Sequence, residues 1–420
     1  MKILQIHKNH RPLGGTEKYY FDLSNLLTKK GHKVAHFSMK HPNNLPSKWE
    51  KYFVNKITFK DVNVFDGPRI LYRMIYALDA KRQISKLLDD FKPDIAHVHN
   101  IYYHISPSVL IELKKMKIPV VYTVHDYHLL TPNVTFYNSN KNCELDERFD
   151  LYNRRLLSFL LFRTVFRKCV KNSYNASFLA SFTLFIQYMF RIYQRNVDCF
   201  ITPSLFMRNK LLEYGFDKRK VKYVPNFLDT NSYKRSKDRN KKYILFFGLF
   251  HEHKGLEVLL RAAKKLPNIN FRIAGSGSDE HRLKEYVINH NLKNVHFLGY
   301  LDSEKLKKEI SSSLFCVVPS LWYENMPYSV LEAFALGKPV IASRIGGIPE
   351  IVDDGINGIL FEPGNVMELT RAIQKLYSNH KLSRKMGIKA RLMIEEKFNP
   401  EIHYQKIMRI YKRAITVNKK

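Results

Sequence analysis

Short apolar runs alternate with longer amphipathic stretches along most of the chain. In the first half, apolar runs of strand length occur at residues 2–7, 33–38, 94–99, 119–124 and 198–203. Between the first two runs, residues 16–30 have the spacing of an amphipathic helix, and Gly31 follows where glycine commonly ends helices. Strands that alternate with helices favour a parallel sheet covered by helices.

The alternation stops near residues 229–242 and then begins again. The segment DTNSYKRSKDRNKK is polar and basic without periodicity, which is typical of an exposed linker. Apolar runs return at residues 243–248, 270–275, 294–299, 314–319 and 339–343, separated by segments of helix length. The pattern therefore predicts two doubly wound α/β domains, which agrees with a length of 420 residues.

Charge is the compositional feature that changes this picture. The chain has 70 Lys and Arg against 38 Asp and Glu, a formal net charge of +32. Such a balance favours anionic partners: nucleic acid, an acidic lipid surface or phosphorylated substrates. The basic residues are spread along the chain without a recognised nucleic-acid motif, so we expect no nucleic-acid partner.

Two further features indicate the compartment. The N-terminal sequence MKILQIHKNH lacks the apolar region of a signal peptide, which predicts a cytoplasmic location. The cysteines are far apart, with no CxxC pair, and are expected to be reduced thiols: Cys143, Cys169, Cys199 and Cys316.

Candidate binding residues follow two strands of the first domain, where ligands of open parallel sheets bind. Gly14 and Gly15 let the backbone approach a ligand closely, and Thr16 is placed to cap the next helix. The strand at 119–124 ends in His125, a titratable group suited to hydrogen bonding a sugar or a phosphate. An ordinary capped turn and a structural histidine are the alternative interpretations.

In the second domain, Lys254 stands beside Gly255 between a strand and a helix. A lysine there can meet a phosphate near the start of the helix, although a solvated lysine is the simpler alternative. The spacing is not GxxxxGK[ST], so a nucleoside triphosphatase P-loop is not supported.

The segment ENMPYSVLEAFALG, from Glu324 to Gly337, has two glutamates eight positions apart. Pro327 suits the first turn of a helix, so Glu324 is expected in the loop at the positive end of the helix dipole. Glu332 is expected inside that helix among apolar neighbours, where a carboxylate needs hydrogen bonds. Helix capping would explain Glu324 alone, whereas a nucleotide ribose, with two hydroxyl donors, would explain Glu332.

At these residues the sequence resembles family 4 of the GT-B glycosyltransferases, whose hallmark is the E-x7-E motif. Further similar features cover most of the chain: the GGxE turn at 14–17, His125, the PN pair at 225–226, the KG pair at 254–255 and GGIPEIV from Gly346. The resemblance implies two Rossmann-like, doubly wound α/β domains that face a cleft, with a C-terminal helix that crosses back to the first domain.

The expected domain ranges follow from the linker and the resemblance. Residues 1–226 would form the acceptor domain, 227–242 the linker, 243–396 the nucleotide-sugar donor domain and 397–420 the returning helix.

The resemblance also implies a retaining, hexosyltransferase-type reaction with a nucleotide-sugar donor and no metal or other cofactor. Glu324 would contact donor sugar hydroxyls, Glu332 the ribose and Lys254 the diphosphate. The remaining implied contacts are His125 near the transferred sugar, Gly14 and Gly15 at the donor phosphates, and Asn325, Met326 and Leu331 at the donor.

One position departs from the family pattern. Relatives commonly carry an arginine for the diphosphate where this chain has Leu249 or His251. We expect protonated His251 to supply the second diphosphate contact.

The segment at 151–195 bears on the acceptor. It has eight Arg and Lys and no Asp or Glu. An aromatic stripe of Phe178, Phe182, Phe185 and Met189 lies opposite Ser173, Ser177, Ser181 and Gln187 at helical spacing. The stripe suits an anionic membrane surface, with core packing as the alternative.

If the membrane interpretation holds, the acceptor is a lipid-linked glycan in cell-envelope polysaccharide assembly. The protein would then be peripheral at the cytoplasmic face of the inner membrane. The rival functions are a nucleotide-sugar epimerase on the same fold and a non-catalytic basic binding protein.

Overall fold

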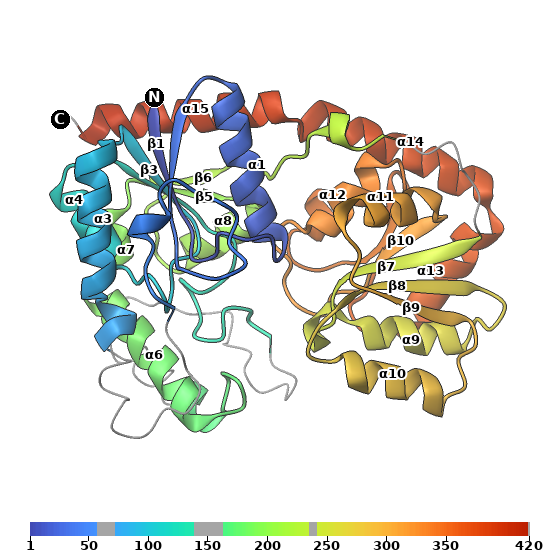
Figure 1. Cartoon of the computed structure of the whole chain (residues 1–420). Coiled ribbons are helices and arrows are strands. Elements are labelled where there is room, and N and C mark those ends of the chain that lie inside the picture. The colour runs from blue at the N-terminus through green and yellow to red at the C-terminus, as the bar shows by residue number, and fades with distance from the viewer. Residues whose placement is uncertain (57–71, 138–162, 235–241, 419–420) are drawn as a thin grey trace. The chain divides into compact units, whose positions relative to one another are not determined.

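The computed structural model describes residues 1–56, 72–137, 163–234 and 242–418. The chain divides into two compact units, Met1–Val224 with His403–Lys420, and Pro225–Ile402. Each unit has a six-stranded sheet in which every pair of neighbouring strands is parallel, with helices packed around it (Figure 1). The predicted fold class of two Rossmann-like domains is therefore confirmed.

The sheet of the first unit has the order β2-β1-β3-β4-β5-β6. Its strands are β1 Lys2–Ile6, β2 Lys33–Phe37, β3 Ile95–Val98, β4 Val120–Thr123, β5 Cys199–Thr202 and β6 Val221–Tyr223. The chain runs from β1 to β2 on one side of β1 and then crosses to β3 on its other side. The strand order therefore reverses between β1 and β3. The register pairs Ile6 with Val98 and Val98 with Tyr122, which brings the residues that follow these strands to one edge.

Helices cover both faces of this sheet. The helices of the unit are α1 Gly15–Lys29, α3 Leu78–Phe91, α4 Ser108–Lys115, α6 Tyr174–Met189, α7 Ile192–Asn196, α8 Leu205–Glu213 and α15 Pro400–Asn418, with a 3-10 turn η1 Glu50–Tyr52, and α6 lies away from the sheet (Figure 1). From His403 onward, α15 belongs to the first unit, where His97 Nδ1 lies 2.6 Å from Tyr411 Oη. This is the returning helix that the resemblance implied.

The sheet of the second unit has the order β12-β11-β10-β7-β8-β9. Its strands are β7 Tyr243–Leu249, β8 Asn270–Ser276, β9 Val295–Gly299, β10 Phe315–Val318, β11 Val340–Ser343 and β12 Gly358–Phe361. Its helices are α9 Leu256–Lys264, α10 Glu280–Asn289, α11 Ser303–Ser312, α12 Tyr328–Ala335, α13 Val366–Ser378 and α14 His380–Lys397, with 3-10 turns η3 Thr230–Ser232, η4 Glu252–Lys254 and η5 Ile348–Glu350. Since β7 pairs with β10, the segments that follow these two strands are neighbours.

Most predicted strands are confirmed, but β6 and β12 were not predicted. Both are short, and β6 has the sequence VKY, which gives no apolar run. Thr16 is not the helix cap, because α1 begins at Gly15 with Gly14 as its N-cap.

Two further expectations need correction. Tyr233 was predicted to lie in an exposed linker, yet it is only 4% exposed, since its ring packs within the second unit. Residues 235–241 of that linker lie outside the described residues. Cys199 and Cys316 are free thiols as predicted, but Cys169 is disulfide-bonded. The prediction for Cys169 failed because the spacing of cysteines in the sequence does not show which thiols meet in the fold. Cys143 lies outside the described residues.

Candidate functional site

The loop after β10 carries Glu324 into the interior of the second unit. Glu324 is 4% exposed, and its Oε1 accepts hydrogen bonds from Lys254 Nζ at 2.7 Å and from Ser320 Oγ at 2.8 Å. Burial alone would raise the pKa of Glu324, but the positive charge of Lys254 and the donors around the carboxylate lower it below its usual value. Glu324 is therefore a carboxylate at neutral pH, and Lys254 Nζ also lies 4.8 Å from the Trp322 ring centroid.

Two glycines explain how the backbone brings these side chains together. Gly255 has a φ of +69°, and a Cβ there would lie 1.8 Å from the carbonyl oxygen of Pro319, at the end of β10. Gly346 has a φ of +59°, and a Cβ there would lie 2.4 Å from the carbonyl oxygen of Glu324. Gly255 of the KG pair and Gly346 of the GGIPEIV segment thus allow the backbone to come close to the Glu324 loop.

The rest of this loop is held by the start of the second unit. The Asn226 amide N–H donates to Met326 Sδ at 3.1 Å, and Asn226 Nδ2 donates to the Met326 carbonyl at 3.3 Å. Asn325 and Met326 are buried, and Leu331 is fully buried on α12. Asn325, Met326 and Leu331 therefore hold the loop and α12 in place. Their expected contacts with the sugar donor stay predictions.

Glu332 lies one turn inside α12 and has a protein partner. Its Oε1 accepts a hydrogen bond from Tyr233 Oη at 2.8 Å. The Tyr233 ring in turn lies beneath Lys307 Nζ, 5.0 Å from the ring centroid. A ligand is therefore not required to explain the placement of Glu332, and its contact with a ribose stays a prediction.

Leu249 and His251 lie at the carboxyl end of β7 as expected. Leu249 is the last residue of the strand and is 43% exposed, so the side chain at this position is open to solvent. His251 Nδ1 lies 2.9 Å from Ser278 Oγ, and its ring stacks on that of His253. Burial, with a further contribution from the Lys254 charge, lowers the pKa of His253 to about 4.

In the first unit, His125 follows β4 and belongs to a buried chain of hydrogen bonds. His125 Nε2 lies 3.0 Å from His99 Nδ1, and His99 Nε2 lies 2.6 Å from Gln5 Oε1. With Gln5 Oε1 as the final acceptor, the Nε2–H of each histidine donates along the chain. Burial lowers the pKa of His125 to about 3, so its ring is neutral at neutral pH.

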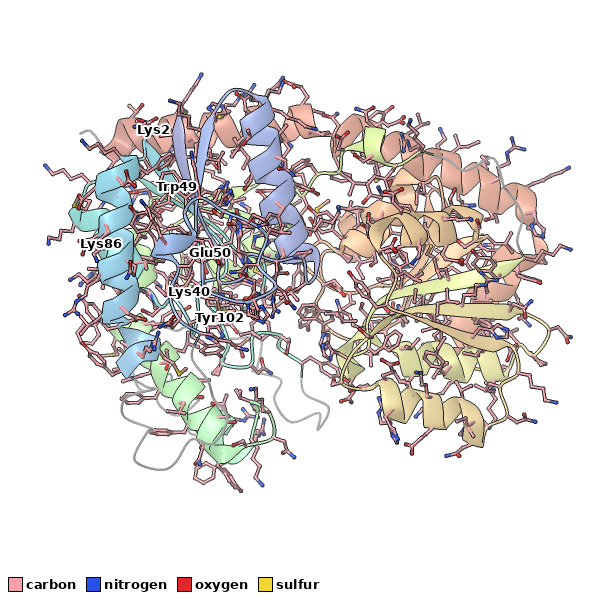
Figure 2. All side chains as sticks on the ribbon, in the orientation of Figure 1. Lys2, Lys40, Trp49, Glu50, Lys86 and Tyr102 are labelled. Atoms are coloured by element: carbon pink, nitrogen blue, oxygen red, sulfur yellow. The ribbon has the colours of Figure 1, made fainter. Side chains whose placement is uncertain are left out.

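Asp126 follows His125 at the same edge of the sheet and is ionised. It accepts from Tyr102 Oη at 2.7 Å and from His128 Nδ1 at 2.9 Å. Burial would raise the pKa of Asp126, but the His128 hydrogen bond and nearby positive charges lower it to about 2. Lys8 Nζ lies 3.6 Å from the ring centroid of Tyr102, a residue labelled in Figure 2.

Sequence patterns did not single out Lys8, His99 or Tyr102. The available signal was their position directly after β1 and β3, the two strands where the order of the sheet reverses. Burial lowers the pKa of Lys8 to about 8, although Asp126 opposes this shift.

Gly14 and Gly15 begin α1. Gly14 has an extended backbone and gives the helix no side-chain cap, and a Cβ there would make only an ordinary contact, 3.7 Å from Glu17 Oε2. The described contacts thus do not require glycine at position 14, and its approach to a donor phosphate stays a prediction.

Comparison with known proteins identifies the family. The model of Glycosyltransferase Family 4 matches residues 13–232, more than half of the 420 residues, and that of Glycosyl transferases group 1 matches residues 229–393. The chain belongs to glycosyltransferase family 4. Lys254, Glu324 and Glu332 of this family 4 protein all fall within the second of these matches.

Three relatives show which kinds of protein this family 4 protein is similar to. An uncharacterized glycosyltransferase of Methanocaldococcus jannaschii is 32% identical over 201 residues, 48% of this chain and 56% of that protein. The chain thus spans little more than half of that relative. An uncharacterized 42.6 kDa protein in the cps region of Klebsiella pneumoniae is 26% identical over 84% of this chain and 87% of its own length. The amylovoran biosynthesis glycosyltransferase AmsK of Erwinia amylovora is 25% identical over 53% of this chain and 58% of its own length.

Solved structures share the fold of the family 4 protein. Sucrose-phosphate synthase from Thermosynechococcus elongatus has a TM-score of 0.74 at 20% identity and covers 99% of both chains. Anabaena HepE, solved in complex with UDP-glucose, has a TM-score of 0.65 at 18% identity, covering 98% of this chain and all of that one. Among the helices that the structure describes, none is long and apolar enough to cross a membrane.

Proposed function

We propose that this protein is a retaining hexosyltransferase that moves a sugar from a nucleotide-sugar donor to a lipid-linked glycan. The observation that carries the proposal is the partly buried Lys254–Glu324 ion pair, formed where two neighbouring strands of the second unit end. The two residues are 70 positions apart, and both belong to motifs that the family resemblance assigned to the donor.

The chemistry of the pair suits departure of a nucleoside diphosphate. Negative charge develops on the leaving group, and an ammonium beside the positive N-terminus of α12 stabilises it without a metal. A donor diphosphate would compete with Glu324 for Lys254, which would release the carboxylate for sugar hydroxyls. Glu332 would exchange or share its Tyr233 hydrogen bond with the ribose.

Other support comes from what related structures contain. Anabaena HepE was solved in complex with UDP and with UDP-glucose, which favours a nucleotide sugar as donor here. Gly14 and Gly15 are expected at the donor phosphates, and His125, kept neutral by burial, is expected to hydrogen-bond the transferred sugar.

The acceptor is proposed from two observations, of which the first is the names of relatives. Besides the amylovoran enzyme, a lipopolysaccharide core biosynthesis glycosyltransferase of Rhizobium meliloti matches this chain. Both names refer to cell-envelope polysaccharides, which favours an acceptor that grows on a lipid carrier at the cytoplasmic face of a membrane.

The second observation is the orientation of α6. The helix buries its polar side, with Ser177, Ser181 and Gln187 each less than 7% exposed, while Phe178 is 52% exposed. Ser181 Oγ hydrogen-bonds Thr164 Oγ1 at 2.7 Å, so the buried polar side is satisfied within the unit. Phe178 and Met189 of the aromatic stripe thus lie on the surface, and Phe182 and Phe185 are half-buried.

Basic residues flank the outward aromatic stripe, with Arg163 and Arg167 before α6 and Arg191 after it. Phe182 stacks on Phe178 along the stripe, with ring centroids 5.8 Å apart. An apolar stripe between cations matches the chemistry of an anionic membrane surface. We therefore propose that α6 docks the enzyme on such a surface, where the lipid-linked acceptor resides.

Docking is tested by flotation with phosphatidylglycerol-containing vesicles. Replacing Phe178, Phe182 and Phe185 by Ser should strongly reduce binding without unfolding the chain, and high salt should weaken wild-type binding. Ile288→Ser, at an exposed apolar residue of the second unit, is the control and should bind like wild type. Binding of the triple variant equal to wild type would remove α6 from the proposal.

The reaction is tested by incubating the protein with a panel of nucleotide sugars in the presence of EDTA. A transferase should release nucleoside diphosphate by slow donor hydrolysis, an epimerase would interconvert sugars without release, and a binding protein would do neither. The anomeric configuration of the first sugar product, determined by NMR, should match that of the donor. Release that depends on a divalent cation would contradict the metal-free mechanism.

A further inference from the structure

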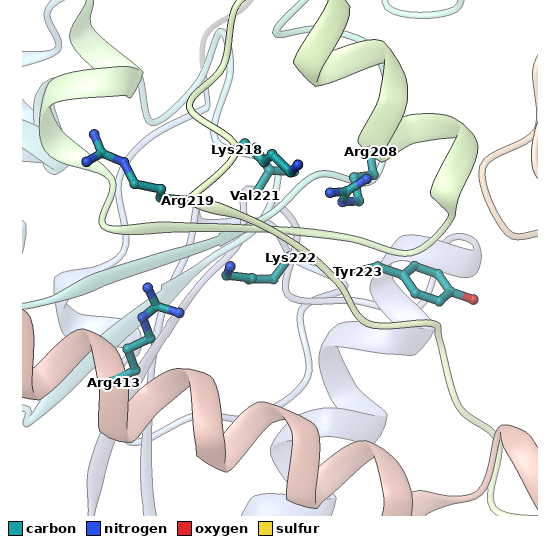
Figure 3. A pocket seen from close by; sticks show the side chains of 7 residues that line it. All are labelled: Arg208, Lys218, Arg219, Val221, Lys222, Tyr223 and Arg413. Atoms are coloured by element: carbon teal, nitrogen blue, oxygen red, sulfur yellow. The ribbon is translucent and has the colours of Figure 1, made fainter.

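A basic pocket of about 380 Å³ lies in the first unit, on the edge strand β6. Its cationic side chains come from three places in the fold: Arg208 on α8, Lys218 and Arg219 in the turn before β6 with Lys222 on the strand, and Arg413 on α15 (Figure 3). The pocket is separate in sequence and in unit from the Lys254–Glu324 pair.

The charges of this pocket are largely unmatched. Arg219 pairs with Asp217, with Nη2 and Oδ2 2.9 Å apart, but no ion pair joins the other four cations to any described residue. Nearby Asp198 is engaged elsewhere, since it accepts from the Val120 amide at 2.8 Å and pairs with Lys114. Four like charges around one hollow repel one another unless an anion joins them.

The buried thiol of Cys199 lies close enough to two of these cations for both of their charges to affect its pKa. Burial raises the pKa of the Cys199 thiol to about 12, and the charges of Lys222 and Arg413 both oppose that shift. In Figure 3 the Arg413 guanidinium extends from α15 toward the strand that bears Lys222. Lys222 and Arg413, which are far apart in the chain, therefore lie near the same buried thiol.

We infer that this pocket binds a ligand with two linked phosphate groups, at a site distinct from the donor site. Two guanidinium forks and two ammonium groups are the side chains that proteins use for phosphates, and the volume falls within the usual range for small-ligand sites. A single carboxylate would leave three of the four charges unmatched, whereas a diphosphate carries enough negative charge for most of them. The inference does not depend on the proposed transfer reaction.

The test is the affinity of the full chain for inorganic pyrophosphate, measured by calorimetry at low ionic strength. The double variant Lys222→Gln, Arg413→Gln keeps most of each side-chain stem and should bind at least about tenfold more weakly. Lys412→Gln removes one charge from the residue of α15 next to Arg413, outside the pocket lining, and should bind like wild type. The comparison is repeated with Lys254→Ala, so that pyrophosphate at the donor site does not mask the result.

Equal affinity of the double variant and its parent in both backgrounds would overturn the inference, as would an equal loss in Lys412→Gln. Phosphatidylcholine vesicles with and without a polyprenyl diphosphate then distinguish the source of the ligand. If the wild-type protein is retained on vesicles that contain the polyprenyl diphosphate and the double variant is not, the ligand of the pocket is a lipid carrier. Pyrophosphate binding without such retention assigns it to a soluble diphosphate.

Discussion

The two units place different chemistry at the same position of the same kind of sheet. In the first unit, the residues that follow β1, β3 and β4 include histidines that burial keeps neutral, with the pKa of His7 and of His125 lowered to about 3. In the second unit, the segments after β7 and β10 bring together a partly buried ion pair, Lys254 and Glu324. A doubly wound sheet thus determines where a ligand can bind, while the side chains decide what chemistry occurs there.

The contrast also suggests a division of work. Neutral rings donate and accept hydrogen bonds without adding charge, which suits contact with sugar hydroxyls. An ammonium held by a carboxylate suits a diphosphate, because the diphosphate can take the place of the carboxylate as the anion beside the ammonium.

Removal of the ammonium should have the largest effect. Lys254→Ala should lower kcat/KM for donor turnover by about 100-fold or more, because the charge that stabilises the leaving diphosphate is lost. Lys254→Arg should recover part of the activity, and Lys264→Ala on the exposed side of α9 should have none of the loss. Thermal unfolding is measured in parallel, since a buried Glu324 without its partner also destabilises the unit. Activity of Lys254→Ala near that of wild type would end the assignment.

Acid should destabilise the first unit more than the second. The folded pKa of His7, His36 and His125 is about 3, against 6.5 for an ordinary histidine. As the pH falls below about 6.5, the unfolded chain takes up protons that the folded unit does not bind until about pH 3, so stability falls with pH across that window. Each pKa unit corresponds to about 1.4 kcal/mol.

Hydrogen–deuterium exchange at about pH 7 and about pH 5, corrected for intrinsic exchange rates, reads the two units separately. Protection in β1, β3 and β4 should fall before protection in β7 and β10. His99→Gln should reduce the difference between the units. Equal loss of protection in both units would show that the histidines do not set the acid limit.

Glu332 offers a smaller and sharper contrast, because the structure gives it a protein partner. If Glu332 holds the ribose, Glu332→Gln should weaken nucleoside diphosphate binding by about tenfold or more through the loss of charged hydrogen bonds. Tyr233→Phe removes only the partner Oη and should leave affinity within about twofold. Calorimetry on both variants checks this, and similar losses in the two would make Glu332 a structural residue of α12.

The smallest effect is expected at His251. We expect protonated His251 to supply the second diphosphate contact, in place of the arginine that relatives carry. His251→Ala should flatten the acid side of the pH dependence of kcat/KM, and Leu249→Arg should tighten donor binding at neutral pH. An unchanged pH profile in His251→Ala would assign the contact to another basic residue.

Particular residues show how far sequence could lead. The alternation of strands and helices sufficed for the two sheets, and motif positions sufficed to place Lys254 and Glu324 beyond the ends of strands. Their direct contact could not be derived from alternation, because it depends on β7 lying next to β10, and strand order is a property of the whole sheet.

The same limit appears in two other places. Tyr233 lies in a polar, basic stretch, so its burial against Glu332 could not be read from local composition. Periodicity divided α6 into an aromatic side and a polar side, but it could not tell which faces inward. The inward polar side required knowledge of Thr164 and the other residues that satisfy it.

The central claim is that Glu324 and Lys254 hold a nucleotide-sugar donor, and the most direct test compares binding with turnover in Glu324→Gln. The donor that the panel identifies is used together with its nucleoside diphosphate. We expect Glu324→Gln to lower kcat strongly, while its affinity for the bare nucleoside diphosphate stays within about threefold of wild type. Wild-type kcat in this variant, or a loss of nucleoside diphosphate affinity as large as the loss of turnover, would contradict it.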